Sequence, residues 1–159
     1  MTTPAQKNLV DSNSAYASGF DKGDLALPPA KQYAVGPAFG ISLGDAHVIR
    51  NAGGSARAAL RDLIISEQFL ATKEILLVKH SDCGMLTFTN EAAHDHVGKQ
   101  LGSEAASEIK GLDFLPFPNL DAAVKDDISF LKASKAIPDS IKISGWVYEV
   151  ETGKVRAVE

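Results

Sequence analysis

A histidine and the only cysteine of the chain stand close together, at His80 and Cys83. Imidazole nitrogen and thiolate sulfur are common zinc ligands, and the loop between the two residues is short enough for both to reach one ion. A lone His near a lone Cys is more often structural, because a zinc site needs at least a third protein ligand. His80 and Cys83 are therefore candidate zinc ligands that require a further partner.

The segment that must position these two residues starts as an apolar run and turns polar at His80. The run Ile75–Lys79 is typical of a strand buried on both faces, in a parallel sheet covered by helices. We therefore expect it inside the sheet and not at an edge. Open α/β sheets bind ligands in loops at the carboxyl ends of their strands. The pattern thus places His80 and Cys83 where a binding site belongs.

The residues before this strand predict a strand, a loop and a helix, which together form the crossover unit of a parallel sheet. Ala46–Ile49 is the short strand, Ser55 is a candidate N-cap, and the helix spans Ala56–Ala71. Gly53 and Gly54 either cradle an anion at the helix N-terminus or permit a tight turn, and the turn is the commoner use. The apolar residues at helical spacing are Ala59, Leu60, Leu63, Ile64, Phe69 and Leu70.

The rest of the chain extends this pattern in both directions. The predicted elements are a helix over Ala5–Phe20, a Pro-rich linker to residue 30, a strand over Lys31–Val35, helices over Glu91–Leu101, Ser103–Lys110 and Leu120–Lys135, and a hairpin of Ile141–Val150 with Lys154–Val158. We predict a single α/β domain over residues 1–159, with a mainly parallel sheet, helices on both faces and a C-terminal hairpin. Residues 1–30 form its N-terminal helical arm and linker.

Composition narrows the function classes. Hydrophobic residues make up 45% of the chain and charged residues 23%, which is the balance of an ordinary globular protein. A net charge of −4 without a basic tract argues against nucleic acid or an anionic membrane as a partner. One Cys excludes an internal disulfide, and the first residues lack the apolar core of a signal peptide. We therefore expect a cytoplasmic protein.

Three motifs in this order resemble those of the β-class carbonic anhydrases. Residues 44–54, GDAHVIRNAGG, closely resemble one signature of that family, and residues 78–85, VKHSDCGM, resemble a second. Residues 145–148, GWVY, followed by TGK at 152–154, are similar to the closing hairpin. The resemblance covers nearly the whole chain from about Tyr16 onward, and three ordered motifs are far more specific than one His-x-x-Cys pair.

This resemblance implies a fold, a reaction and an assembly. Members of the family are zinc enzymes that interconvert carbon dioxide and bicarbonate, on a parallel-sheet α/β fold that dimerises, and some relatives hydrolyse carbonyl sulfide or carbon disulfide. It assigns zinc to His80 and Cys83 and the substrate pocket to Gly53 and Gly84. It also implies that the N-terminal segment packs on a second subunit, so we expect a homodimer or a higher even oligomer.

The chain departs from the family pattern in one place. The family holds zinc with a first Cys as well, in a Cys-x-x-x-Arg signature with an Asp between, at the end of the first strand. Here Lys31–Val35 passes directly into Gly36-Pro37, and about ten residues have no counterpart, which leaves a connection near the minimum for a parallel crossover. The first Cys and the Asp–Arg pair that orders the zinc-bound water are therefore absent.

Three functions stay open on this basis. The first is a zinc lyase of the carbonic anhydrase family, with a replacement ligand from Asp45, Asp82 or a partner subunit. The second is a catalytically silent homologue that acts as a dimerisation or regulatory subunit. The third is a carbonyl sulfide or carbon disulfide hydrolase, which uses the same zinc chemistry. We predict carbon dioxide hydration that is absent or weak, because two ligands hold zinc only loosely.

Overall fold

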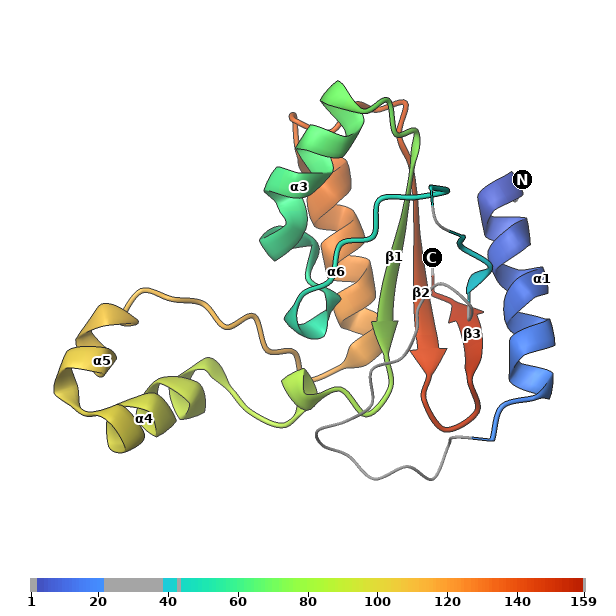
Figure 1. Ribbon diagram of the computed structural model, residues 1–159. Coiled ribbons are helices and arrows are strands. Elements are labelled where there is room, and N and C mark those ends of the chain that lie inside the picture. Colours follow the sequence, from blue (N-terminus) through green and yellow to red (C-terminus); the bar gives the residue numbers. More distant parts are fainter. Residues whose placement is uncertain (1–2, 22–38, 43, 159) are drawn as a thin grey trace.

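The computed structural model describes residues 3–21, 39–42 and 44–158, which form a small sheet with helices around it (Figure 1). The chain is therefore an α/β protein, as predicted. None of the helices in these ranges is long and apolar enough to cross a membrane. In chain order the elements are α1 (Pro4–Ser18), η1 (Ala52–Gly54), α3 (Ala56–Phe69), β1 (Glu74–His80), η2 (Gly84–Leu86), α4 (Asn90–Leu101), α5 (Ser103–Glu108), α6 (Leu120–Ala133), β2 (Lys142–Glu149) and β3 (Lys154–Ala157).

The described sheet has the order β1-β2-β3. β1 and β2 pair in parallel, from Glu74 opposite Lys142 to His80 opposite Tyr148, and β3 adds antiparallel to β2 in a shorter ladder. A parallel pair needs a long crossover, and this one carries α4, α5 and α6. Gly153, with φ of 69°, makes the turn between β2 and β3, so the predicted C-terminal hairpin is confirmed.

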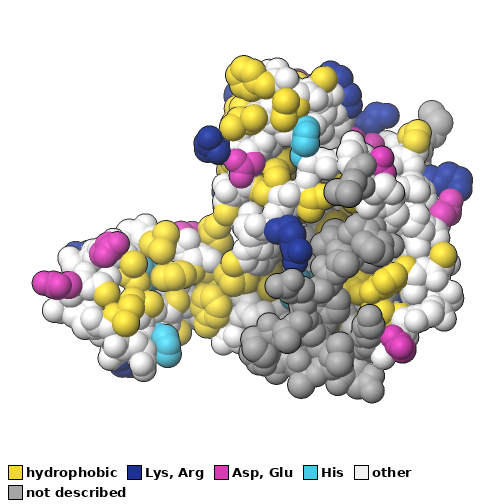
Figure 2. Space-filling model, viewed as in Figure 1, with side chains coloured by type: hydrophobic (Ala, Val, Ile, Leu, Met, Phe, Trp, Pro, Cys, Tyr) yellow, Lys and Arg dark blue, Asp and Glu magenta, His cyan; other side chains and the backbone are white. Residues whose placement is uncertain are grey.

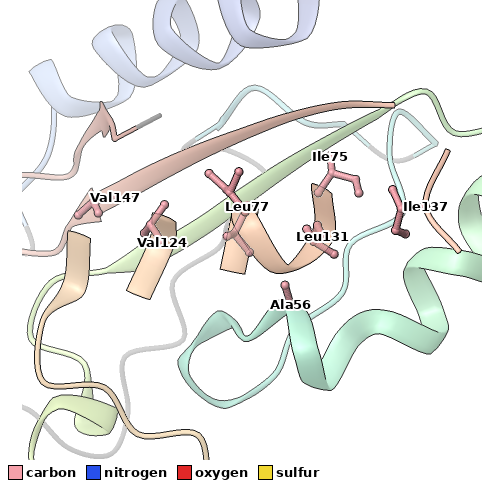
Figure 3. Packing of buried hydrophobic residues seen from close by; sticks show 8 residues of the cluster. Ala56, Ile75, Leu77, Val124, Leu131, Ile137 and Val147 are labelled. Atoms are coloured by element: carbon pink, nitrogen blue, oxygen red, sulfur yellow. The ribbon is translucent and has the colours of Figure 1, made fainter. Parts of the chain in front are cut away.

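One face of the sheet packs on α3 and α6. The buried cluster joins Leu77 of β1 to Val124, Ile128 and Leu131, which form one stripe of α6 and have no exposed surface (Figure 3). Gly145 of β2 lies beneath this stripe, and a side chain there would collide with Val124 and Ile128. The absence of a Cβ at Gly145 is therefore what lets α6 approach the sheet so closely.

The other face meets α1. Leu9 of α1 is 1% exposed and packs in a second buried cluster with Trp146 of β2. Asn13 fastens α1 to the hairpin, because its amide donates to the Gly153 carbonyl at 2.8 Å and accepts from the Val155 N–H at 2.7 Å. Helices therefore lie on both faces of the sheet, as predicted.

Two of the predicted strands are not seen in the described structure. Lys31–Val35 lies outside the described residues. Ala46–Ile49 is irregular and unpaired, and Val48 is 52% exposed, so the prediction of a strand there is wrong. Among the described strands β1 is consequently at the edge, and the expected interior position of Ile75–Lys79 is wrong for this part of the chain. The reason is that no described strand lies between residues 46–49 and β1 to pair with either of them.

The last turn of α3 also departs from the predicted apolar stripe. Phe69 and Leu70 are 78% and 56% exposed, and the helix ends at Phe69, two residues early. Glu67 is instead only 7% exposed, and neither of its carboxylate oxygens has a hydrogen-bond partner among the described residues. Burial raises the pKa of this carboxyl above its ordinary value of 4.5, because the charged form loses its hydration.

A buried ion pair joins β1 to the rest of the core. The Lys79 and Asp127 side chains are 3% and 9% exposed, and Lys79 Nζ donates to Asp127 Oδ2 at 2.9 Å. The same ammonium donates to the carbonyls of Gly53 and Gly54, at 2.8 and 3.2 Å. Asp127 Oδ2 also accepts from the Ala56 N–H at the start of α3, at 3.1 Å. One ion pair therefore holds β1, α6, η1 and α3 together.

We predict that Asp127→Ala lowers the free energy of unfolding by about 3–5 kcal/mol, because it leaves the buried Lys79 charge without a counterion. The double variant Lys79→Met/Asp127→Ala should lose less than the sum of the two single changes, since neither charge is then stranded. Urea unfolding of all four proteins measures this coupling, and additive losses would contradict it.

Asp121→Ala is the matched control for this experiment. Asp121 makes a two-point ion pair with Arg156, at 2.6 and 2.9 Å, but both side chains are close to half exposed. Solvent-exposed pairs contribute about 0.2–1 kcal/mol, so the same Asp→Ala change should have a small effect here.

A second prediction concerns pH. Because folding raises the pKa of Glu67, the folded state binds this proton more readily than the unfolded state. The contribution of Glu67 to the free energy of unfolding is therefore fully present below pH 4.5, and it is lost as the pH rises through the pKa of Glu67 in the folded state. Glu67→Gln should therefore be more stable than the parent at pH 7.5, with an advantage that shrinks toward pH 4.5. Urea unfolding at both pH values tests this, and an advantage that did not vary with pH would count against it.

Candidate functional site

The candidate site lies in the loop that follows β1 (Figure 1). His80 is the last residue of the strand, and Cys83 directly precedes the η2 turn. Ser81 fixes the loop to the end of β2, because its N–H donates to the Tyr148 carbonyl at 2.9 Å and its Oγ accepts from the Val150 N–H at 2.9 Å. The two predicted ligands therefore sit at the carboxyl edge of the parallel pair, where the sequence pattern placed them.

The structure brings the side chains of His80 and Cys83 into hydrogen-bond contact. His80 Nδ1 lies 2.7 Å from the Ser81 carbonyl oxygen. A carbonyl oxygen only accepts, so Nδ1 carries a proton, and Nε2 remains for Cys83 or for a metal ion. Cys83 is 5% exposed, and His80 is partly buried.

The electrostatics of the pair favour transfer of the thiol proton to the imidazole. The hydrogen bond with Cys83 is the largest cause that raises the pKa of His80, with the Ser81 carbonyl adding to it and burial opposing it. Burial raises the pKa of Cys83, but hydrogen bonds from His80 and the Met85 backbone, together with nearby positive charge, outweigh burial and lower that pKa. Cys83 is thus held toward the thiolate, which is the form that binds metals.

A complete zinc site is not formed by the described residues. In the described ranges 3–21, 39–42 and 44–158, no three His, Cys, Asp or Glu residues lie close enough together to hold a metal ion. Asp45, one proposed replacement ligand, accepts a hydrogen bond from the Ser42 N–H at 2.9 Å. Asp82, the other, lies in the loop with φ of 52°. Neither completes a three-ligand set with His80 and Cys83, so the donors present do not fit a catalytic zinc ion.

The predicted pocket residues have different surroundings. Gly53 lines a cavity that also reaches His80, and a Cβ on Gly53 would lie 2.8 Å from the Met85 side chain. Gly84 follows Cys83, and a Cβ there would meet nothing within 4 Å. Their assignment to a substrate pocket stays a prediction.

Gly53 and Gly54 make a tight turn, which was the commoner of the two uses considered. Both have positive φ, of 67° and 57°, and a Cβ on Gly54 would lie 2.8 Å from the Val78 carbonyl oxygen. Their carbonyls bind the Lys79 ammonium, so this turn serves to hold a cation of the protein itself.

Sequence reasoning missed several residues that shape the site. Lys79 is a charged residue in an apolar strand, and the alternation of side chains along the strand places it on the buried face. This position indicates that Lys79 needs a buried counterion. Asn51 was also missed, although it closes the turn before α3 by accepting from the Ser55 N–H at 2.7 Å and donating to the Ser55 carbonyl at 2.9 Å. Ser55 itself caps α3 as predicted, by accepting from the Ala58 N–H.

Comparison with known proteins finds relatives that align with nearly the whole chain. Beta-carbonic anhydrase 1 of Mycobacterium tuberculosis is 33% identical over 162 residues, which cover 95% of this chain and 96% of that protein. Because that alignment is longer than the 159-residue chain, the relative has residues that this chain lacks. A carbon disulfide hydrolase of Saccharolobus solfataricus is 36% identical over 141 residues, covering 75% of this chain and 68% of that one.

Solved structures agree with these relatives. A carbonic anhydrase from Glaciozyma antarctica has 42% sequence identity and a TM-score of 0.77, with 99% of both chains covered. A carbonic anhydrase from Streptococcus mutans has 39% identity and a TM-score of 0.74, with both chains fully covered. No family model matches the sequence. On the strength of these full-length relatives, the chain belongs to the β-class carbonic anhydrase family.

Proposed function

We propose that this carbonic anhydrase-like protein hydrates carbon dioxide weakly or not at all, because its zinc site is incomplete. The observation that carries the proposal is the pairing of His80 with Cys83 without a third ligand among the described residues. Catalytic zinc takes three protein ligands and keeps one position for water. With two ligands the ion is weakly held and competes poorly against chelators.

The missing ligand affects the water molecule that zinc would activate. Zinc, when firmly bound in such sites, lowers the pKa of water from 15.7 to about 7. In this chain the side chains of His80 and Cys83 are instead hydrogen-bonded to each other, and the Asp–Arg pair that would orient a water has no counterpart in the sequence. Loss of such orienting residues reduces metal affinity or activity by about 10–100-fold in comparable sites. Together the two losses support a residual activity at most.

A silent role as a dimerisation or regulatory subunit is the second candidate. α4 and α5 project away from the sheet, and no residue of either helix is buried (Figure 1). Hydrophobic side chains gather on this projecting part in Figure 2. In this part of the chain Leu101 of α4 is 73% exposed, and Leu112, in the connection that follows α5, is 51% exposed. Contiguous exposed apolar surface of this kind marks protein–protein contacts, which supports a homodimer or a higher even oligomer.

A third candidate differs only in substrate. The relative from Saccharolobus solfataricus is a carbon disulfide hydrolase, and carbonyl sulfide is chemically close to carbon disulfide. Both reactions would use the same ligand pair, so both are weakened by the same missing ligand. Measuring hydrogen sulfide release from either compound beside carbon dioxide hydration separates the substrates.

We expect zinc well below one ion per chain in protein purified without a metal-affinity column, and its complete loss on mild chelation. Stopped-flow hydration of carbon dioxide should stay close to the uncatalysed rate even with added zinc. Cys83→Ser and His80→Ala should abolish whatever zinc remains. His96→Ala, a change at an exposed histidine on α4, should leave it unaltered. Robust turnover that Cys83→Ser abolished would contradict the proposal.

Assembly gives a further prediction. Light scattering at micromolar concentration should return at least twice the chain mass of 16.8 kDa. Leu101→Glu combined with Leu112→Glu should shift the protein toward monomer, because both changes place charge on the exposed apolar surface of the projecting helices. Phe69→Glu, at an equally exposed apolar residue on α3, is the control and should leave the mass unchanged. A monomer mass for the parent would remove the claim.

A further inference from the structure

The donor pair at the end of β1 differs from a zinc site in charge as well as in number. His80 and Cys83 supply one nitrogen and one sulfur, and all four histidines and the single cysteine lie within the described ranges, so residues outside those ranges add no donor of either kind. A divalent ion on one thiolate also keeps a net positive charge. Cys83 already feels the charge of Lys79 and is buried, so an uncompensated positive charge there is costly.

A third soft donor, the thioether of Met85, lies close to this pair. Met85 is 9% exposed and belongs to the same buried cluster as Cys83, together with Phe117 and Ala123. The Met85 N–H donates to the Cys83 sulfur, which fixes the two residues beside each other. The Met85 side chain has three rotatable bonds, which let its sulfur adjust to a nearby partner. The end of β1 therefore gathers a His, a Cys and a Met.

This donor set is wrong for zinc and suits a soft monovalent ion. Zinc in proteins takes Cys, His, Asp and Glu, whereas thiolate and thioether sulfur together favour Cu(I). A monovalent ion on the Cys83 thiolate is neutral, so its burial costs less than that of a charged complex. Asp82 is exposed, and solvent screens its charge. The bond of His80 Nδ1 to the Ser81 carbonyl also orients the ring and leaves Nε2 for a metal, as in other metal-binding histidines.

We propose that His80, Cys83 and Met85 bind Cu(I) in place of zinc. The ion takes the position between the Cys83 sulfur and His80 Nε2, where the two side chains are hydrogen-bonded in this structure. Binding releases the thiol proton to solvent, and no electron is transferred, because copper enters and stays as Cu(I). The inference rests on the proposed incompleteness of the zinc site. Tight zinc binding would contradict that proposed function, whereas a zinc-poor chain that ignores Cu(I) would overturn only this inference.

Competition with a coloured Cu(I) chelator tests the proposal on the full chain. Under anaerobic conditions the protein should withdraw one Cu(I) per chain from the Cu(I)–bicinchoninate complex, and an excess of Zn²⁺ should not displace the copper. Cys83→Ser should lose this binding, because it removes the thiolate. His96→Ala, at an exposed histidine on α4, is the control and should keep it. No withdrawal by the parent, or equal withdrawal by Cys83→Ser, would overturn the proposal.

Met85→Leu separates the thioether from the packing of the residue, since it removes the sulfur and keeps a similar apolar volume. Cu(I) binding should weaken by about 10–100-fold, the range for residues that support a metal site. The weak zinc affinity, measured against a fluorescent chelator, should not change, because zinc does not use thioether donors. Leu86→Val, in the same cluster, removes no donor and should alter neither affinity. An equal loss for both metals, or no loss for Cu(I), would overturn the role of Met85.

X-ray absorption gives a readout that does not depend on affinity. Met1 is the only other methionine of the chain, so selenomethionine places selenium at two positions. With Cu(I) bound, the selenium edge of the labelled parent should show a copper neighbour at bonding distance. The labelled Met85→Leu variant, which carries selenium only at Met1, should show none. A copper-loaded parent without a copper neighbour at selenium would overturn the three-donor site.

Discussion

The ion pair between Lys79 and Asp127 is the interaction on which the site depends most directly. Lys79 is the residue immediately before His80, and its ammonium uses all three protons, on Asp127 and on the two carbonyls of the glycine turn. A charge at this depth is stable only when its partners are complete, so the pair selects one arrangement of β1, α6 and the turn. The direction in which His80 leaves the strand follows from that arrangement.

The two candidate zinc ligands keep a defined geometry because that geometry is local. The β1 strand, the loop Ser81–Cys83 and the hydrogen bonds between Ser81 and the end of β2 all depend on residues 74–85 and on β2. The missing ligand belongs, by family resemblance, to a different strand. A change confined to that strand therefore leaves His80 and Cys83 together, each with the other as a hydrogen-bond partner.

Much of the fold could be predicted from local pattern, because the periodic helices and the hairpin are specified by their own residues. Ser55 caps α3 as its sequence suggests, and the stripe of α6 through Val124 and Ile128 is buried. The strand over Ala46–Ile49 failed because a strand needs a neighbour, which β-type residues do not guarantee. The burial of Glu67 was missed for a related reason. Helical spacing indicates which residues share one face of a helix, but it does not show which other elements pack against that face.

The burial of Cys83 has a practical consequence for following motion in this protein. It is the only sulfhydryl in the chain, and at 5% exposure a thiol reagent reaches it only when the loop after β1 opens. The rate of its modification therefore reports the local opening equilibrium of that loop, without competing signal from any other residue. Because the loop is tied to the end of β2, the same rate also registers how firmly the two parallel strands hold together at their carboxyl ends.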